Sequence, residues 1–510
     1  MAHLWALSGV LASVKHSAAM SVRNLSELVS RAAADHPDKP ALVAGSRTVT
    51  WGELEGAVAA LAAGLVARGL SAGDRVGLLL PNGVEFATAY FGVLRAGLVA
   101  LPLNTAYTAT EIGYQLADSG ASLVLASPSL ASLAAESSVE VVAVGSDAWS
   151  SLLAAPEPLP EPRGGAEDLA VLLYTSGTSG RPKGAMLTHR ALLANLAQLS
   201  RIEPAVVAPD DRVLLVLPLF HVYGLNAGLG MTAYVGATGV LAERFDPVET
   251  LGLVESEQVS NIVGAPPMYV AWSMLPRVSE SLVSLRLAVS GSAPLPAPVL
   301  ASLLETSGHH VFEGYGLTET APVLTTSLCS EVAKPGSIGR PIPGVELLLL
   351  DEHGEEVDEG DPGEVVVRGA NLFSGYWPDG TGGPDADGWF RTGDVAVADD
   401  DGDLYLVDRV RELILVSGFN VYPREVEDAI LGHPAVVEVA VIGIPHPYTG
   451  ETVKAFVVPV AGSAPTADDV IEFAARRLAR FKCPTAVEIV DELPHSAIGK
   501  VAKGRLRESA

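Results

Sequence analysis

Near its start the chain alternates between two hydrophobic patterns. The segment WGELEGAVAALAAGLVARGL (51–70) repeats apolar residues at helical spacing and closes with a glycine, as helices often do. The short apolar run DRVGLLL (74–80) is typical of a buried strand, and a Pro-Asn-Gly turn ends it. A second helical pattern (84–97) and a second apolar run (98–104) follow. This repeated alternation predicts an α/β fold.

The pattern changes after about Val345. Three apolar segments, VELLLLDEHGEEV, GEVVVRG and GDLYLVDR, carry acidic, glycine-rich turns, which predicts a small β-rich layer. Beyond Arg411, strand and helix patterns mix over about 100 residues and predict a compact α+β unit. We therefore expect a disordered leader (1–22), a large N-terminal domain of layered α/β subdomains that includes the β-rich layer (23–408), and an α+β C-terminal domain (413–510).

Composition excludes several classes of function. With 510 residues, the chain is long enough for roughly three domains. The net charge of −27 argues against a nucleic-acid partner, because binding phosphates takes Lys and Arg. The two cysteines, Cys329 and Cys483, lie far apart, so neither a disulfide framework nor a zinc site is predicted. No stretch is typical of a membrane span, and the first residues lack the basic start of an export signal, so we expect a cytoplasmic protein.

A glycine-rich segment lies between an apolar run and a helical pattern. Its sequence, YTSGTSGRPKGAML (174–187), holds three glycines, several hydroxyl side chains and Lys183. Glycines let backbone N–H groups converge on an anion, and a lysine adds a mobile charge for a terminal phosphate. The spacing is not the G-x-x-x-x-G-K-[ST] of the common nucleotide loop. On these residues alone, a phosphate loop and a plain surface loop are equally good interpretations.

The full string TSGTSGRPKG resembles, at every position, the signature loop of the adenylate-forming superfamily. That superfamily includes acyl- and aryl-CoA synthetases, peptide-synthetase adenylation domains and beetle luciferases. Further segments resemble its other motifs, in the same order: LPLFHVYGLN, SGSAPLP, EGYGLTET, RTGD, DRVRELILVSGFNVYPREVE and PHSAIGK. The resemblance covers nearly the whole chain. It implies the superfamily's fold, with a mobile C-terminal domain, and the acyl-CoA synthetase (fatty-acid–CoA ligase) branch.

The family reaction joins a carboxylate to the α-phosphorus of ATP and expels pyrophosphate. Two anions must meet, so the site needs cations and Mg²⁺. The resemblance implies Glu319 as the Mg²⁺ ligand, Thr318 as a donor to the α-phosphate, and Lys500 as a mobile cation from the C-terminal domain. Together with His221, these are the expected catalytic residues. The other expected contacts to ATP or AMP are Thr175, Ser176, Gly177, Thr178, Ser179, Gly180, Lys183, Gly291, Ser292, Ala293, Pro294, Glu313, Gly314, Tyr315, Gly316, Asp394 and Arg409.

Three of these residues have a specific implied partner on the nucleotide. Tyr315 offers a flat face for adenine. Asp394 resembles the aspartate that holds both ribose hydroxyls, and a carboxylate accepts two hydrogen bonds well. Arg409 resembles the arginine that contacts ribose or phosphate. The alternatives are an ordinary loop for the Tyr315 segment, and a surface turn and a surface salt bridge for the other two.

In the CoA ligases of this family, a thiol attacks the acyl adenylate after the small domain rotates. The resemblance implies a hinge at 409–412 with Arg411 as its pivot. It also implies that Ser417, Gly418 and Phe419 form the turn that approaches the pantetheine arm. The chain departs from the family pattern at the pivot, where Asp or Lys is commoner, and at Asp408, where Gly is commoner. A plain hairpin turn is the alternative for 417–419.

The acid pocket and the class of acid are predicted from the motif that contains His221 and from an uncharged segment around it. His221 lies where the family has a gate between the acid pocket and the carboxylate site. The segment Val213–Ala242 contains no Lys, Arg, Asp or Glu, and an unpaired second carboxylate would be costly there. A fatty acid is therefore favoured, with aryl and short dicarboxylic acids as alternatives. The expected pocket residues are His221, Tyr223, Gly224, Gly264 and Met268.

The implied cosubstrates are ATP and coenzyme A, used with Mg²⁺. A homodimer is left open. One alternative is a ligase that transfers its acyl adenylate to a carrier protein, but no extra segment that would block rotation occurs after Arg391. A catalytically inactive nucleotide-binding regulator is a rival from another class. The presence of Lys183, Glu319, Asp394 and Lys500 together argues against it.

Overall fold

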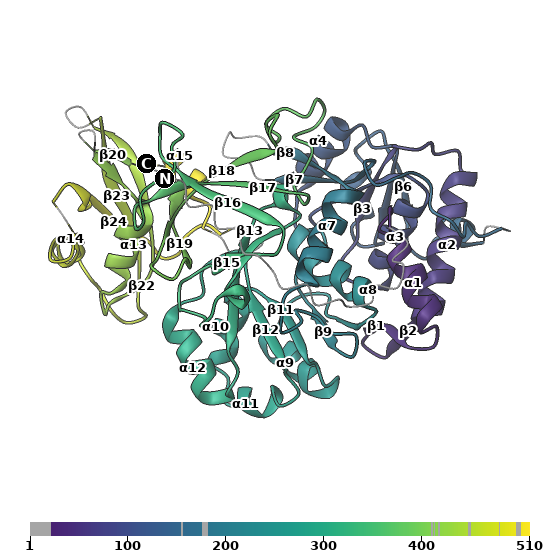
Figure 1. Cartoon of the computed structure of the whole chain (residues 1–510), viewed down its shortest axis with the longest axis horizontal. Coiled ribbons are helices and arrows are strands. Elements are labelled where there is room, and N and C mark those ends of the chain that lie inside the picture. Colours follow the sequence, from purple (N-terminus) through teal and green to yellow (C-terminus); the bar gives the residue numbers. More distant parts are fainter. Residues whose placement is uncertain are drawn as a thin grey trace, which may run out of the picture.

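The computed structural model describes residues 22–154, 157–175, 182–409, 412, 414–416, 419–446, 450–478, 480–495 and 501–509. Two large sheets with their helices form one side of the molecule, and the C-terminal strands and helices form the other (Figure 1). The predicted α/β fold, with a β-rich layer and a smaller α+β C-terminal part, is confirmed. The predicted leader lies outside the described residues except for Val22, and the boundaries at 408 and 413 stay predictions.

The first sheet has six strands in the order β6-β5-β3-β4-β7-β8, all parallel except the β7–β8 pair. Every residue of β4 and β5 is buried, as expected for parallel strands covered on both faces. The strands are β3 (Arg75–Leu79), β4 (Val99–Pro102), β5 (Leu123–Ala126), β6 (Glu140–Ala143), β7 (Leu169–Thr175) and β8 (Lys183–Thr188). The helices of this region are α2 (Trp51–Ala67), α3 (Val84–Arg95), α4 (Ala109–Ser119), α5 (Ala131–Ala134), α6 (Asp147–Leu153) and α7 (His189–Leu199).

The second sheet has nine strands in the order β15-β14-β13-β12-β11-β9-β10-β1-β2. Its central strands are parallel, and β2, β14 and β15 pair antiparallel at its two ends. The strands are β1 (Pro40–Ala44), β2 (Arg47–Thr50), β9 (Arg212–Leu215), β10 (Thr238–Leu241), β11 (Asn261–Gly264), β12 (Leu287–Ser290), β13 (Val311–Gly316), β14 (Val323–Thr326) and β15 (Arg340–Pro341). The helices are α1 (Glu27–Asp35), α8 (Met231–Val235), α9 (Pro247–Ser256), α10 (Pro266–Ser273), α11 (Val278–Ser281) and α12 (Ala297–Ser307). A π-helix spans Tyr223–Gly230, and short 3-10 helices lie at Thr318–Thr320 and Ser327–Cys329.

Two smaller sheets follow. The predicted β-rich layer is an antiparallel sheet of β16 (Val345–Leu350), β17 (Gly363–Gly369), β18 (Trp389–Ala398) and β19 (Leu404–Arg409). The C-terminal sheet has the order β21-β20-β23-β22, with β24 parallel to β23. Its elements are β20 (Ile414–Val416), β21 (Phe419–Val421), α13 (Pro423–Leu431), β22 (Val436–His446), β23 (Gly450–Pro459), α14 (Ala467–Ala475), the turn Arg480–Lys482, β24 (Ala486–Ile489) and α15 (Lys503–Ser509).

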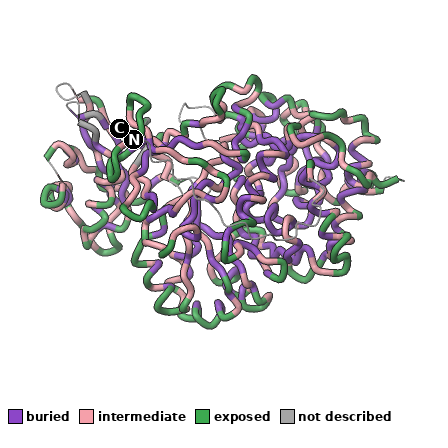
Figure 2. The backbone as a smooth tube through the Cα atoms, viewed as in Figure 1, coloured by how far each residue is buried: buried purple, intermediate pink, exposed green. Residues whose placement is uncertain are grey.

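Burial is densest in the two large sheets and the helices that cover them (Figure 2). Within the described ranges, no helix combines the length and the apolar character that crossing a membrane requires. Within the described residues, Cys329 and Cys483 form no disulfide.

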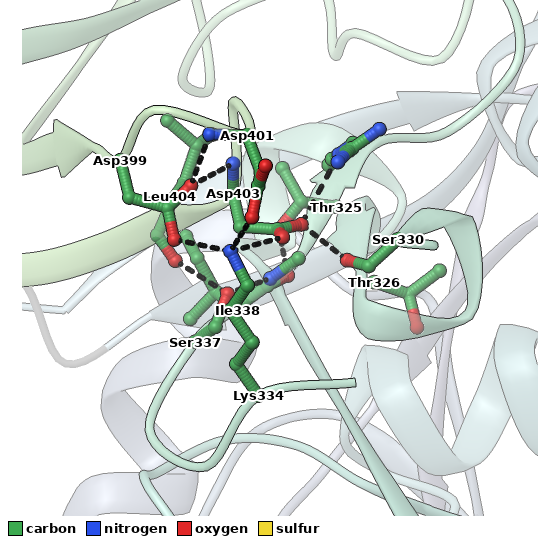
Figure 3. A network of polar contacts seen from close by, with 12 residues as sticks. Thr325, Thr326, Ser330, Lys334, Ser337, Ile338, Asp399, Asp401, Asp403 and Leu404 are labelled. Atoms are coloured by element: carbon green, nitrogen blue, oxygen red, sulfur yellow. Dashed lines mark hydrogen bonds and ion pairs between the residues drawn. The ribbon is translucent and has the colours of Figure 1, made fainter. Parts of the chain in front are cut away.

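A partly exposed lysine network joins the β-rich layer to the nine-stranded sheet (Figure 3). Lys334 follows β14, and its Nζ lies 2.6 Å from carboxylate oxygens of Asp399 and Asp401 and 3.2 Å from one of Asp403, all in or beside the β18–β19 turn. Hydrogen bonds from Lys334 to these carboxylates, Asp399 first, raise the pKa of the ammonium. Asp403 also accepts from Arg340 on β15 at 3.2 Å. The network fixes the β18–β19 turn, and with it the strand that carries Asp394.

His189 gives the N-terminal domain a pH-dependent stability. Its Nδ1 accepts the backbone N–H of Leu25 at 3.1 Å, and burial lowers its pKa from 6.5 to about 4. Below pH 6.5 this histidine binds a proton in the unfolded chain but stays neutral in the folded chain until the pH nears 4. The free energy of unfolding therefore falls as the pH drops. We expect His189 to account for a loss of roughly 3 kcal/mol of unfolding free energy between pH 7 and pH 4. Denaturant titrations of His189→Gln should show a flatter pH dependence over this range, whereas substitution of the exposed His36 by Gln should not.

Candidate functional site

A cleft of about 2390 Å³ lies where the large sheets, the β-rich layer and the C-terminal domain meet. The N-terminal side of its wall includes the ends of β7 and β13, the start of β8 and the Gly291–Pro294 turn. The C-terminal domain contributes residues from α13, β22 and α15. Most of the segments that the sequence singled out, though far apart in the chain, thus border one cavity. This arrangement favours a ligand held between the two domains.

Lys183 begins β8 and lines the cleft. It pairs with Thr175 at the end of β7, whose hydroxyl donates to the Lys183 carbonyl at 3.5 Å. The predicted phosphate residues 176–180 lie outside the described residues. The Nζ of Lys183 lies 5.3 Å from the centre of the Tyr376 ring, within range of a cation–π contact. The antiparallel β7–β8 pair therefore brings a lysine and a hydroxyl into the cleft from the two ends of the glycine-rich segment.

The Gly291–Pro294 turn is held under strain against the cleft. Ser292 has a φ of +75°, which is unusual for a non-glycine residue and characteristic of functional turns. Gly291 lies so close to Tyr223 that an added Cβ would approach its ring to 3.0 Å. A larger residue at position 291 would press on the Tyr223 ring where the turn meets the wall that follows β9.

Glu313 supports this turn from beneath. Its carboxylate accepts the backbone N–H groups of Leu295 at 2.9 Å and Gly336 at 3.3 Å. Burial raises the pKa of this carboxyl, although both backbone donors oppose the shift. Glu313 lines the cleft, but its oxygens are engaged by the backbone. The carboxylate therefore holds the turn, and the nucleotide contact of Glu313 stays a prediction.

Tyr315 and Asp394 form a buried pair at the floor of the cleft. The Tyr315 hydroxyl donates to Oδ2 of Asp394 at 2.6 Å, and only 9% and 5% of the two residues are exposed. Asp394 lies on β18 opposite Arg409 of β19, whose side chain lies outside the described atoms. Gly314 and Gly316 flank Tyr315 in the lining. Both residues of the pair line the cleft.

Thr318 and Glu319 lie in a short turn after β13 and both line the cleft. The Glu319 carboxylate accepts the Tyr376 hydroxyl at 2.6 Å through Oε1. The sequence interpretation overlooked Tyr376, which contacts both Lys183 and Glu319. The signal in the sequence was the string SGYW (374–377), in which two aromatic residues follow a glycine.

The expected acid-pocket residues separate into two groups. His221 and Tyr223 line the cleft, beside the uncharged side chains Phe220, Val222, Ala227, Val263 and Val289. Gly224, Gly264 and Met268 do not line it. Gly224 packs against the Pro218 carbonyl, Gly264 lies against the Tyr269 ring, and Met268 belongs to the core beneath α10.

Several expected residues of the C-terminal part lie outside the described residues: Arg411, Ser417, Gly418 and Lys500, with the side chain of Phe419. His495 and Val501, on either side of the segment that contains Lys500, line the cleft and pair with each other. Lys503, which sequence reasoning gave a lesser role, also lines it. Its Nζ lies 3.2 Å from Glu412 and 2.8 Å from Glu427.

The described part of the chain holds one group of three carboxylates close enough to share a metal ion, namely Asp399, Asp401 and Asp403. The ammonium of Lys334 lies among them and offsets one of their three negative charges. These carboxylates therefore form a structural cluster with their own cation. Glu319, by contrast, is among the carboxylates that line the cleft.

Comparison with known proteins identifies the family. The family model "AMP-binding enzyme" matches residues 29–377, and "AMP-binding enzyme C-terminal domain" matches residues 425–500. The chain is 40% identical to a feruloyl-CoA synthase from an Amycolatopsis species, over 92% of this chain and 96% of that protein. It is 34% identical to a long-chain-fatty-acid–CoA ligase from Bacillus subtilis, over 97% and 96% of the two chains.

Solved structures agree with these relatives. ATP-bound MatB from Rhodopseudomonas palustris superposes with a TM-score of 0.87 at 36% identity, covering 95% of this chain and 99% of that one. The anthranilate CoA ligase AuaEII in complex with anthranoyl-AMP gives a TM-score of 0.85 at 29% identity, covering 96% and 97%. The chain belongs to the AMP-binding enzymes, and it is an AMP-forming acyl-CoA ligase.

Proposed function

We propose that the acid activated by this ligase is an apolar one, a fatty acid in first place and an aryl acid as the alternative. The observation that carries the proposal is the uncharged wall beside His221. A second carboxylate on the substrate would lose its hydration there, and the described side chains of this wall include no cation to pair with it. The relatives named for feruloyl and long-chain fatty acids support the same class.

The wall is continuous because neighbouring strands build it. Val263 on β11 and Val289 on β12 lie opposite each other in the sheet register. Tyr223 closes the space against Gly291. Burial raises the pKa of the Tyr223 hydroxyl, which therefore stays neutral at physiological pH. A neutral wall of this kind favours an acid whose carboxylate is its sole charge, pointed toward His221 and the nucleotide.

For the first half-reaction we assign the nucleotide contacts as follows. Lys183 pairs with the outgoing phosphates, and Thr318 donates to the α-phosphate. Asp394 accepts the ribose hydroxyls, and Tyr315 lies against adenine. Lys500 neutralises the charge that develops as the acid carboxylate attacks the α-phosphorus, displaces pyrophosphate and forms acyl-AMP.

The residues around Glu319 fit a magnesium ion. Mg²⁺ is commonly held by one or two carboxylates together with substrate phosphates and water. Glu319 lines the cleft, and the Tyr376 hydroxyl occupies one of its oxygens and orients the other. When bound, the ion would neutralise phosphate charge. The chain's own contribution is to hold that carboxylate in place beside Lys183.

In the second half-reaction the thiol of coenzyme A attacks the acyl carbonyl and AMP leaves. We assign the pantetheine approach to Ser417, Gly418 and Phe419, and the rotation that exposes them to a pivot at Arg411. His221 would separate the acid pocket from the reacting carboxylate.

We place the enzyme in the cytoplasm. Sedimentation of the purified protein would decide between a monomer and a homodimer.

The acid class is tested by pyrophosphate release with ATP and Mg²⁺, measured with and without coenzyme A. We expect a long-chain fatty acid or ferulate to support release with a kcat/KM at least about 100-fold above that of succinate, because an unpaired buried charge costs several kcal/mol. Coenzyme A should accelerate AMP release. If succinate matches the apolar acids, the acid assignment is wrong. If adenylate forms but coenzyme A never accelerates AMP release, a carrier protein is the acceptor.

A further inference from the structure

Tyr376 lies between two groups that the proposed function places on the phosphates. Its hydroxyl donates to Oε1 of Glu319 at 2.6 Å, and its ring centre lies 5.3 Å from Nζ of Lys183. The hydroxyl and the ring thus contact groups of opposite charge. Glu319 comes from the turn after β13, and Lys183 comes from the first position of β8. A single half-buried side chain therefore connects the two large sheets at the cleft.

The backbone fixes the ring in this place. The Tyr376 N–H donates to Thr381 at 2.9 Å, and the Gly380 N–H donates back to the Tyr376 carbonyl at 2.8 Å. The flanking residues pair with the edge of β8: Trp377 donates to the Gly184 carbonyl at 2.8 Å. The turn that carries the tyrosine is thus anchored one residue from Lys183.

Two side contacts restrict the ring further. Phe373 packs edge-on against it, with ring centres 5.1 Å apart. A Cβ added at Gly382 would approach the ring to 3.1 Å, so glycine is needed for the ring to lie where it does. Both the position of the ring and the aim of the hydroxyl are therefore set before any ligand enters.

We propose that Tyr376 is a positioning residue that aligns Glu319 for a phosphate-bound divalent cation and holds Lys183 beside it. The inference rests on the proposed nucleotide roles of these two residues. A hydrogen bond that holds one carboxylate oxygen restricts rotation of the whole group, and partners of this kind commonly change metal affinity by about tenfold or more when removed. The ring restricts the ammonium through a weaker cation–π contact.

Calorimetric titration with ATP, in the absence of any acid, separates the two contacts. Tyr376→Phe removes the hydroxyl and keeps the ring. It should weaken binding of ATP with Mg²⁺ by about tenfold and leave binding of ATP in EDTA unchanged. Tyr376→Leu removes both contacts and should also weaken metal-free binding, by about threefold. With Glu319→Ala already present, Tyr376→Phe should bring no further loss of magnesium dependence.

Tyr114→Phe is the matched control. Its hydroxyl also borders the cleft and donates to the Pro182 carbonyl at 3.2 Å, next to Lys183. It should leave the magnesium dependence unchanged. The inference is overturned if Tyr376→Phe binds Mg²⁺ and ATP like the wild type, or if it weakens metal-free and magnesium binding equally, as general loosening of the turn would. A wild-type enzyme that binds no ATP would instead overturn the proposed nucleotide site.

Discussion

Lys500→Ala should reduce acid-dependent pyrophosphate release by roughly 10²–10³-fold, because it removes a preorganised charge from the transition state of adenylate formation. Thioester formation from supplied acyl-AMP and coenzyme A should keep most of its rate, since the lysine withdraws before that step in the proposed cycle. His495 and Val501 border the cleft and pair across the segment that contains Lys500, which supports its delivery to the nucleotide. Single-turnover measurements of the two half-reactions test the prediction.

Lys454→Ala is the control for the loss of a lysine from the same domain. Lys454 lies on β23 and forms an ion pair with Glu488 at 3.0 Å, and it does not line the cleft. Both half-reactions should survive this change. Equal loss of the two half-reactions in Lys500→Ala would show that the residue serves the fold or both steps, and the two-state role would then be wrong.

The sequence predicted best those features that depend on residues close together in the chain, such as the spacing of apolar residues in one element or the residues of one motif. The helix–strand–helix order of α2, β3 and α3 could be predicted because it depends on the spacing of apolar residues that are close in sequence. Tyr315 and Asp394 belong to two different sequence motifs, which lie 79 positions apart in the chain. Their resemblance to a family implied a shared nucleotide, and the fold joins them by a direct hydrogen bond. Periodicity alone would not have predicted that contact.

The acid pocket shows where the sequence was insufficient. Gly224, Gly264 and Met268 were chosen for their motif or segment, but successive side chains on an element point in different directions. In the structure Met268 faces the core with Trp272, and Gly264 contacts Tyr269, while the preceding Val263 lines the cleft. Tyr376 was missed for a related reason. Its partners are remote in sequence and meet only when the turn at 375–377 pairs with β8.

Asp394→Ala should lower kcat/KM for ATP by about 100-fold, mostly through a higher KM. In the proposed function the carboxylate accepts the ribose hydroxyls, and hydrogen bonds to a charged group contribute about 1.5–3 kcal/mol each. Asp394 lines the cleft although only 5% of it is exposed. The Tyr315 hydroxyl, which donates to Oδ2 at 2.6 Å, would lose its acceptor as well.

A substrate analogue gives this prediction its specific readout. Wild-type enzyme should prefer ATP to 2′-deoxy-ATP by about tenfold, the contribution of one such hydrogen bond, whereas Asp394→Ala should treat them nearly alike. Tyr315→Phe keeps the carboxylate and removes its buried donor, so it should lower kcat/KM and retain the preference for ATP. Discrimination that persists in Asp394→Ala would place the ribose elsewhere. Discrimination lost only with the carboxylate would assign the ribose to Asp394, because general damage to the cleft would weaken both nucleotides equally.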